Sequence, residues 1–171
     1  MELKPFIRDV PDFPQPGVLF RDITPLLSEP KAVNAAIDRL CEDALARGAQ
    51  NIVGIESRGF IFGTPLADRL GLPFIPVRKP GKLPARRMSV EYSLEYGESQ
   101  LDIHADAMAE GERAYIVDDL LATGGTAMAT AKLVELVGGI VAGFGFVIEL
   151  EALKGREKLG SYEATSLVRY Q

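Results

Sequence analysis

The sequence predicts an α/β fold, with a mostly parallel, twisted sheet flanked by helices. Short apolar runs typical of buried strands alternate along the chain with longer segments whose apolar residues have helical spacing. This alternation is the pattern of parallel strands joined by helical crossovers. A length of 171 residues suits one domain with a full hydrophobic core, and no repeat, low-complexity tract or shift in composition marks a second domain.

Each predicted helix ends at a glycine, which suits a helix C-cap because it adopts left-handed backbone angles without strain. Apolar runs such as NIVGIE and IVAGFGFVIEL have the composition of buried strands. The segments on either side of Tyr96-Gly97 alternate as extended chain does. The predicted elements, in chain order, are helix 31–47, strand 51–56, helix 59–70, strand 72–77, extended segments 89–96 and 100–106, strand 114–118, helix 126–137 and strand 140–150.

Residues 1–30 are expected to form a small hood, or flap, over the sheet. The segment DFPQPGVLFRDITPLL, residues 12–27, is too rich in proline to join a parallel sheet, because each proline removes a backbone donor. We therefore expect an irregular flap that packs on top of the sheet, as part of a single domain spanning residues 1–171.

Composition and charge favour a soluble, cytoplasmic protein. Residues 1–13 lack the apolar core of a signal peptide, and no apolar run approaches the ~20 residues of a membrane span. The single Cys41 cannot form an internal disulfide and is expected to be a semi-buried thiol in a reducing compartment. A net charge of −5 argues against nucleic acid as the main partner, although a basic cluster at residues 78–87 suits a small polyanion.

Three of the predicted strands end in polar groups. These are the segments 56–59, 78–79 and 118–126, which read ESRG, RK and DDLLATGGT. In a parallel sheet, ligands bind beyond the carboxyl ends of the strands. The three segments are therefore expected to converge on one site.

The segment 118–126 has the chemistry of a site for a sugar phosphate. Glycines between a strand and a helix leave backbone N–H groups open to a phosphate, and the positive end of the helix favours an anion. Asp118 and Asp119 suit the two hydroxyls of a ribose. Capping of the helix by one aspartate and one threonine is the alternative explanation, but it leaves the second aspartate unexplained. The Walker A motif and the GxGxxG fingerprint of dinucleotide-binding proteins are both absent.

The run YIVDDLLATGGT, residues 115–126, resembles the phosphoribosyl diphosphate-binding signature of the type I phosphoribosyltransferases. Nearly the whole chain matches, in order, the pattern of the adenine-specific members of this family. The matching segments besides the signature are 12–27, ESRGFIFG, RKPGKLP, YSLEYG and IELEALKGREKL. The resemblance implies transfer of 5-phosphoribose from 5-phosphoribosyl 1-diphosphate to N9 of adenine, giving AMP and pyrophosphate.

The resemblance also implies which residues contact phosphoribosyl diphosphate. The expected contacts are Asp118 and Asp119 with the ribose hydroxyls, Ala122, Thr123, Gly124, Gly125 and Thr126 with the 5′-phosphate, and Ser57, Arg58, Arg78 and Lys79 with the leaving pyrophosphate. Arg58 is counted among the catalytic residues. No cage of carboxylates for a metal is visible, so Mg²⁺ is expected to be held mainly by the substrate and water. The family often has a cis peptide at the position of Glu56-Ser57.

On the base side, the resemblance implies a loop, residues 81–97, that closes over the site and excludes water. Lys82 and Tyr96 belong to this loop, and Glu95 would be the general acid or a hydrogen-bond partner at adenine N7. Contact of Lys82, Arg86 or Arg87 with pyrophosphate, in the same or a neighbouring subunit, stands beside the simpler interpretation that these are solvated cations.

The hood would supply the adenine pocket. Leu19 and Phe20 would be its apolar walls, and the backbone of Leu19 and Arg21 would read the edge of the base that carries N6 and N1. Leu150, near the end of the last predicted strand, would cover the other face. The alternative for Phe20 is a place in the core.

Two other functions use parts of the same sequence pattern. A purine-sensing regulator keeps the phosphoribosyl diphosphate loop but needs a DNA-binding segment, which is not evident in this sequence. A transferase for guanine, hypoxanthine or xanthine shares the two aspartates but should lack the segment 12–27. His104 is expected to be a surface or packing residue. Since the family is usually dimeric, a homodimer is expected.

Overall fold

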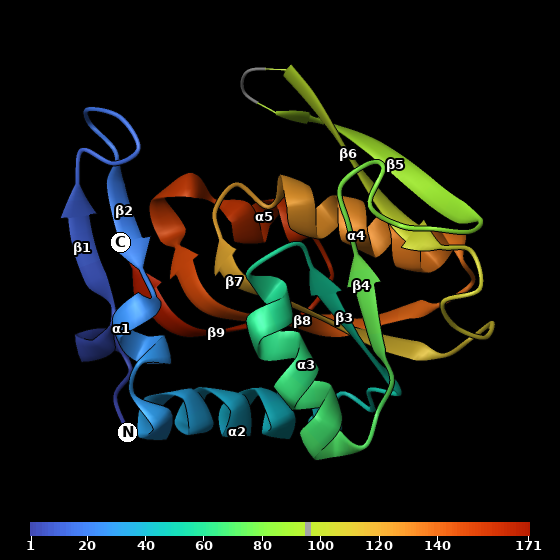
Figure 1. Cartoon of the computed structure of the whole chain (residues 1–171), viewed down its shortest axis with the longest axis horizontal. Helices are drawn as coiled ribbons and strands as arrows, with labels where there is room; N and C mark the ends of the chain where they lie inside the picture. Colours follow the sequence, from blue (N-terminus) through green and yellow to red (C-terminus); the bar gives the residue numbers. More distant parts are fainter. Residues whose placement is uncertain (95–96) are drawn as a thin grey trace.

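The computed structural model describes residues 1–94 and 97–171. At its centre is a parallel sheet of five strands in the order β4-β3-β7-β8-β9 (Figure 1). The predicted α/β fold with a mostly parallel sheet is therefore confirmed. The strands of this sheet are β3 (Asn51–Ile55), β4 (Phe74–Val77), β7 (Arg113–Leu121), β8 (Ile140–Leu150) and β9 (Ala164–Tyr170).

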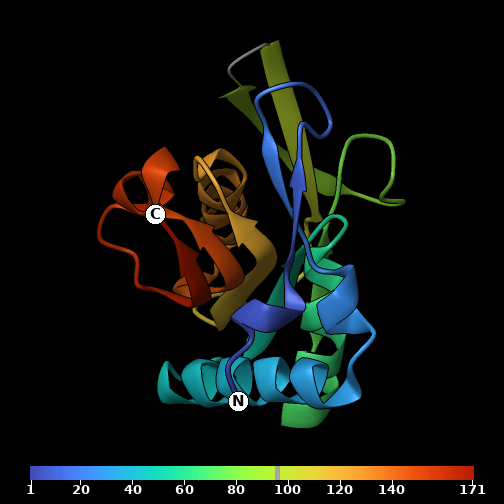
Figure 2. The ribbon, with the colours of Figure 1, turned by 90° about the vertical axis from the view of Figure 1, so that its left-hand side faces the viewer.

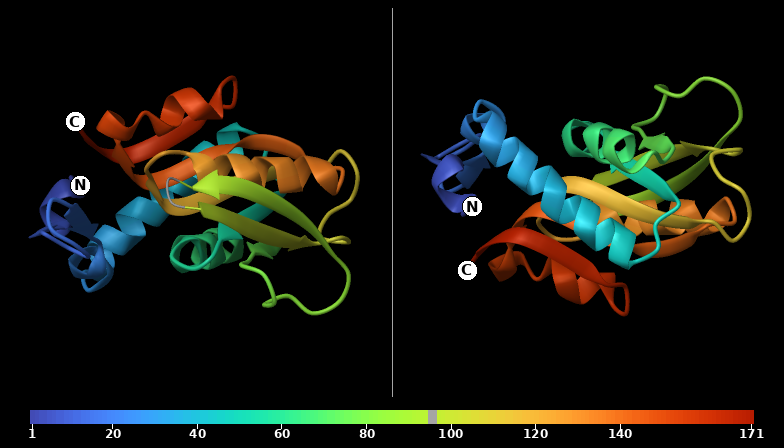
Figure 3. Two further views of the ribbon diagram at one scale, coloured as in Figure 1. Left: turned by 90° about the horizontal axis from the view of Figure 1, so that it is seen from above. Right: turned by 90° about the horizontal axis from the view of Figure 1, so that it is seen from below.

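Helices cover both faces of the sheet (Figures 1 and 3). The helices α2 (Pro30–Ala46) and α3 (Gly59–Leu70) pack on one face, and α4 (Gly125–Leu136) and the short α5 (Gly155–Leu159) pack on the other. The three long helices lie within one residue of their predicted bounds. Both α2 and α3 are followed by a glycine with positive φ, at Gly48 and Gly71, as the C-cap argument requires.

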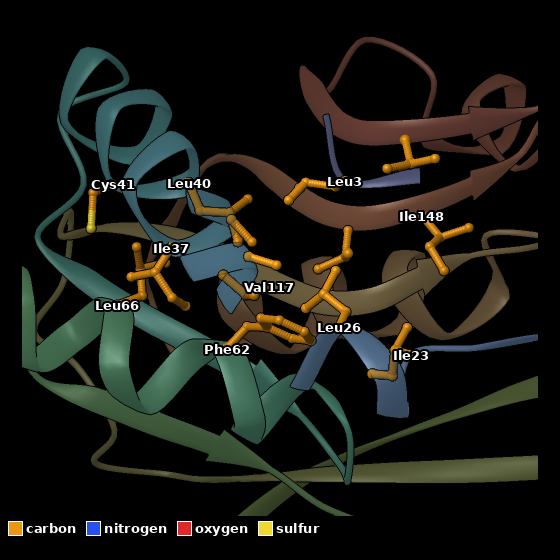
Figure 4. Close-up of a cluster of buried hydrophobic side chains, with 14 of the residues drawn as sticks. Leu3, Ile23, Leu26, Ile37, Leu40, Cys41, Phe62, Leu66, Val117 and Ile148 are labelled. Carbon is orange, nitrogen blue, oxygen red and sulfur yellow. The ribbon is translucent and has the colours of Figure 1, made fainter. Parts of the chain in front are cut away.

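Alternation of side chains along the central strands divides the core into two clusters. On β7, Tyr115 and Val117 face α2 and α3, whereas Ala114 and Ile116 face α4. The first cluster also takes in the N-terminal region, because the buried Leu26 lies close to Val117 (Figure 4). Both faces of the sheet are thus dry, which explains why its strands read as continuous apolar runs.

The strand β9 was not predicted, and it changes two expectations. Its sequence, ATSLVRY, mixes polar and apolar residues, because an edge strand is paired on one side only and is less buried. The strand 140–150 is therefore not the last one, and Leu150 lies at the end of an inner strand. The strand β7 also runs to Leu121, so that Asp118 and Asp119 lie inside it and not after it.

The hood is more regular than expected. Residues Arg8–Pro11 (β1) and Leu19–Asp22 (β2) pair as an antiparallel two-stranded sheet, with a 3-10 helix (Lys4–Phe6) before it and α1 (Thr24–Leu27) after it. The expectation that this segment stays out of the parallel sheet is confirmed, but the expected irregular flap is wrong. Pro14 and Pro16 lie in the connection between the strands, where no ladder bond is needed.

The hood and a second antiparallel hairpin lie on opposite sides of the edge where the central strands end (Figures 1 and 2). This hairpin consists of β5 (Arg87–Leu94) and β6 (Gly97–His104), which agrees with the two extended segments that were predicted. A pair of backbone hydrogen bonds between Arg78 and Asp102 joins the hairpin to the end of β4. Cys41 is buried in α2, as expected for a structural thiol. No helix in the described part of the chain is long and apolar enough to cross a membrane.

Candidate active site

A cavity of about 320 Å³ opens at the carboxyl ends of β3 and β7, where α4 begins. This edge of the sheet lies between the hood and the hairpin (Figure 1). All three predicted segments contribute to the cavity, as the position of strand ends in a parallel sheet requires. Its lining residues are Glu56, Ser57, Arg58, Lys79, Asp118, Asp119, Leu120, Leu121, Ala122, Thr123, Gly124, Gly125, Thr126 and Ala127.

The turn after β3 is held by the carboxylate of Glu56. It accepts a hydrogen bond of 2.7 Å from the backbone N–H of Lys79, and Arg78 Nε lies 3.3 Å from the same oxygen. Burial opposes ionisation of Glu56, but the Lys79 N–H and the Arg78 guanidinium hold its pKa below the ordinary value. The peptide bond between Glu56 and Ser57 is cis, as the resemblance implied. The first two strand ends are therefore linked directly to each other.

The adjacent aspartates have different environments, because neighbouring residues of a strand point to opposite sides. Asp119 accepts a hydrogen bond of 2.5 Å from Arg58 Nε. Asp118 instead lies close to Gly59, and its Oδ1 accepts a 2.9 Å hydrogen bond from the backbone N–H of Asp119. Burial, followed by repulsion from Asp119, raises the pKa of Asp118 well above its ordinary value. The carboxyl groups of Asp118 and Asp119 together suit hydroxyl donors or a cation as partners.

The loop 122–126 leads from β7 into the first turn of α4. Gly124 has a φ of +84°, in the left-handed region that favours glycine. A Cβ at Gly124 would lie 2.7 Å from the carbonyl oxygen of Gly155, so another part of the backbone passes directly behind the loop. The backbone N–H groups at the start of α4 have no partner within the helix and are available to an anion.

The structure brings together most, but not all, of the residues predicted for phosphoribosyl diphosphate. Arg78 is the exception, since its guanidinium pairs with Glu56 and it does not line the cavity. Lys82 is exposed, and Arg87 lies 3.4 Å from the buried carboxylate of Asp102. Glu95 and Tyr96 lie outside the described residues.

The residues predicted for adenine lie apart from the cavity lining. Leu19, Phe20 and Arg21 form most of β2, where Leu19 is exposed and Phe20 packs edge-on against Phe13 at 5.2 Å between ring centroids. The guanidinium of Arg21 lies 3.8 Å from the centre of the Tyr170 ring. Leu150 is half-buried at the end of β8. Leu19 thus offers an apolar surface beside the sheet edge, and Phe20 is not part of the buried core.

Several residues near the loop 122–126 were missed by reasoning from the sequence. Tyr92 of the hairpin lies with its hydroxyl 3.3 Å from Thr126 Oγ1, and Lys158 Nζ lies 3.8 Å from the point that a Cβ on Gly125 would occupy. Gly155 packs its backbone on Ala122. The segment IELEALKGREKL contained the only sequence signal for the last two, as a match without an assigned role. His104 Nε2 lies 2.9 Å from the carbonyl oxygen of Pro84, in agreement with a packing role.

The described residues contain no cluster of three or more His, Cys, Asp or Glu side chains that would hold a metal ion. Asp118 and Asp119 nevertheless supply carboxylate oxygens at the cavity, which are ligands that Mg²⁺ accepts. A cation near them would also relieve the repulsion that raises the pKa of Asp118. The residues present therefore fit a magnesium ion that arrives with a polyanionic substrate.

The fold and the cavity are those of a phosphoribosyl transferase domain, whose family matches residues 23–164. Adenine phosphoribosyltransferase from Gloeobacter violaceus is 61% identical over 99% of this chain and 100% of that protein. The crystal structure of adenine phosphoribosyltransferase from Thermoanaerobacter pseudethanolicus has a TM-score of 0.95 and 54% identity, with 98% of each chain covered. The enzyme from Saccharomyces cerevisiae, solved with an imino-altritol bisphosphate and adenine, has a TM-score of 0.90 and 41% identity over 96% of each chain. This chain belongs to the adenine phosphoribosyltransferase family.

Proposed function

We propose that this chain transfers 5-phosphoribose from 5-phosphoribosyl 1-diphosphate to N9 of adenine, giving AMP and pyrophosphate in purine salvage. The observation that carries the proposal is a single cavity in which two aspartates adjoin an open glycine loop at a helix N-terminus. The adenine bound in the similar yeast enzyme, and full-length identity to adenine-specific transferases, support the choice of base.

The 5′-phosphate binds in the loop 122–126. The backbone N–H groups at the start of α4 donate to its oxygens, and the positive end of the helix favours its charge. The hydroxyls of Thr123 and Thr126 add donors that a glycine loop lacks. Gly124 and Gly125 have no side chains between the phosphate and the backbone, so the anion approaches the N–H groups closely.

The ribose hydroxyls bind to Asp118 and Asp119. Asp119 is paired with Arg58, and partial burial of Asp118 beside another carboxylate raises its pKa. Each ribose hydroxyl brings a donor that stabilises an ionised carboxylate. Substrate binding therefore removes part of the unfavourable energy of two adjacent acids, which favours the ribose over ligands without cis hydroxyls.

The pyrophosphate leaves toward Ser57, Arg58 and Lys79, which line the cavity on the side of β3. Cations aimed at the leaving group stabilise the negative charge that develops on it in the transition state. Arg78 acts indirectly, because it pairs with Glu56 and keeps the turn after β3 in place. It contacts pyrophosphate only if this pair opens. When bound, Mg²⁺ would neutralise charge on the diphosphate and orient its oxygens.

The hood binds adenine through its second strand. Pro11 lies opposite Leu19 and has no N–H to donate, so this pair suits a non-hydrogen-bonded position of the ladder. The backbone groups of Leu19, and of Arg21 two residues further on, then point away from β1. They read N1 and N6 of adenine, with Leu19 and Phe20 against one face of the base and Leu150 against the other. A 6-oxopurine has the donor and acceptor exchanged on this edge and is rejected.

The segment 81–97 is only partly a loop, because Arg87–Leu94 form strand β5, and its closure completes the site. Glu95 acts at adenine N7, as the acid or as the hydrogen-bond partner that makes N9 a better nucleophile, and Tyr96 and Lys82 arrive with it. The reaction passes through an oxocarbenium-like transition state, and the closed loop keeps water from trapping that cation. We propose further that residues 1–171 act as one domain with residues 1–30 as its hood, and that the protein works in the cytoplasm as a homodimer.

The test is incubation of the protein with phosphoribosyl diphosphate, Mg²⁺ and each nucleobase in turn, with and without EDTA. We expect AMP from adenine only, and loss of the product when EDTA removes the metal. Equal rates with guanine or hypoxanthine would contradict the assignment of the base. No product from any base, together with tight binding of phosphoribosyl diphosphate, would indicate a sensor and not an enzyme.

A further inference from the structure

We propose that Glu149 and Arg156 are positioning residues for the loop 122–126, and that they set its affinity for the phosphate of the substrate. They do so by holding the turn at Lys154-Gly155 against the back of the loop. This inference rests on the function proposed above for that loop. Neither residue lines the cavity, so their effect on the phosphate is indirect.

The loop and the turn touch through backbone atoms, and the side chain of Leu121 lies beside them. A Cβ at Gly124 would lie 2.7 Å from the carbonyl oxygen of Gly155, and one at Gly155 would overlap the carbonyl oxygen of Ala122. Gly155 is buried, and Lys154 before it has a left-handed φ of 55°. Because backbone packs directly on backbone at Gly124 and Gly155, a displacement of the turn is transmitted to the loop.

Arg156 follows this turn and fixes it to the sheet. Its Nε donates to Glu149 Oε1 at 2.9 Å and its Nη2 to Oε2 at 2.5 Å, which is a bidentate ion pair. The same guanidinium donates to the carbonyl oxygen of Ala164 at 2.6 Å and to Ser166 Oγ at 3.1 Å. One side chain thus joins α5 to the ends of β8 and β9.

Glu149 is suited to this role because it is only 3% exposed and lies near the end of β8. Hydrogen bonding from Arg156 lowers its pKa below the ordinary value against the opposing effect of burial, so the carboxylate stays ionised and the pair intact. In the sheet, Glu149 is aligned with Leu121, the residue that leads into the loop. The loop is therefore held by β7, which leads into it, and by the turn at Lys154-Gly155, which Arg156 fixes against its back.

The experiment compares Arg156→Lys and Glu149→Gln with the matched control Arg169→Ala. Arg169 also faces the carboxylates of Glu149, at 3.6 Å, and of Glu151, at 3.7 Å, but it belongs to β9 and has no recorded contact with Lys154 or Gly155 themselves. Lysine keeps the charge of Arg156 but not its planar fork. We expect the KM for phosphoribosyl diphosphate and the Kd for ribose 5-phosphate to rise by about tenfold or more in both variants, as a misplaced binding loop should cause. The KM for adenine should change by less than about twofold, and the control should resemble the wild type.

The inference would be overturned if both KM values rose equally. It would also be overturned by a lower Tm with unchanged affinity for ribose 5-phosphate, and either result would indicate a purely structural ion pair. If Arg156→Lys does not fold, Glu149→Gln and Gly155→Ala test the same contact from its other parts. Ribose 5-phosphate binding also separates this inference from the proposed reaction. A wild-type protein without transferase activity would refute the reaction, whereas the comparison of ribose 5-phosphate affinities would still decide the role of Arg156.

Discussion

Arg58 Nε donates a hydrogen bond to Asp119 Oδ2 over 2.5 Å, which pairs the cation proposed for pyrophosphate with a carboxylate proposed for ribose. The Asp119 side chain is 9% exposed and that of Arg58 is 50% exposed, so the carboxylate of the pair is enclosed by the protein, whereas the guanidinium is accessible. Under the proposed assignment, substrate would give both residues new partners. The pair itself holds two groups of the proposed site in place.

Replacement of both aspartates should weaken substrate binding. Asp118→Asn with Asp119→Asn removes the acceptors for the ribose hydroxyls and leaves Arg58 unpaired. We expect the Kd for phosphoribosyl diphosphate to rise by about tenfold or more, since hydrogen bonds to charged groups contribute about 1.5–3 kcal/mol each. Calorimetric titration with Mg²⁺ present measures it. Asp106→Asn, which removes an exposed charge elsewhere, is the control, and an unchanged affinity in the double variant would refute the ribose assignment.

The raised pKa of Asp118 has a consequence for stability. Because the folded chain binds this proton more tightly than the unfolded chain, the free energy of unfolding falls as the pH rises from about 4 through the raised folded value. Asp118→Asn removes this penalty. We expect its Tm to be higher than that of the wild type at about pH 7.5. Thermal melts across the pH range should show the gain vanish below about pH 4. A gain that does not depend on pH would contradict ionisation of a buried carboxyl as its cause.

Glu95 is proposed to act on the base and not on phosphoribosyl diphosphate. Glu95→Gln should therefore lower kcat by about a hundredfold, the lower end of the range for loss of a general acid, with little change in the Kd for phosphoribosyl diphosphate. Steady-state kinetics and a binding titration separate the two effects. Glu98→Gln, an exposed change in the same hairpin, is the matched control. Equal loss of turnover and of binding in Glu95→Gln would disprove its place on the base side.

The hood is anchored to the sheet by Arg21, whose guanidinium lies 3.8 Å from the centre of the Tyr170 ring and also pairs with Asp9. Tyr170→Leu removes the ring under the cation and should loosen β2. A cation–π contact contributes about 0.5–2 kcal/mol, so we expect the KM for adenine to rise by about twofold to thirtyfold with the KM for phosphoribosyl diphosphate unchanged. Tyr170→Phe keeps the ring and should behave as the wild type. An adenine KM that rises equally in Tyr170→Phe would show that the ring is not what matters.

Much of the fold follows from local sequence properties. The helices at 30–46, 59–70 and 125–136 have apolar spacing and terminal glycines that act within one or two turns of chain. The inner strands are apolar on both faces because helices cover both, so they stand out as runs. The loop 122–126 was also predictable, because an open backbone before a helix is a property of the glycines themselves.

Tertiary structure decided the rest. The edge strand β9 and the hood strands are partly exposed, so their sequences carry no continuous apolar run, and pairing with a neighbour determines whether they form. Three contacts each join segments that are more than twenty residues apart. They are those of Arg78 with Glu56, of Arg58 with Asp119 and of Gly155 with Ala122. Such contacts depend on the order in which strands lie in the sheet, and a pattern that repeats every two or four residues contains no information about that order. The sequence alone therefore determined most of the groups that line the cavity, whereas the tertiary structure decided which of them hold one another in place.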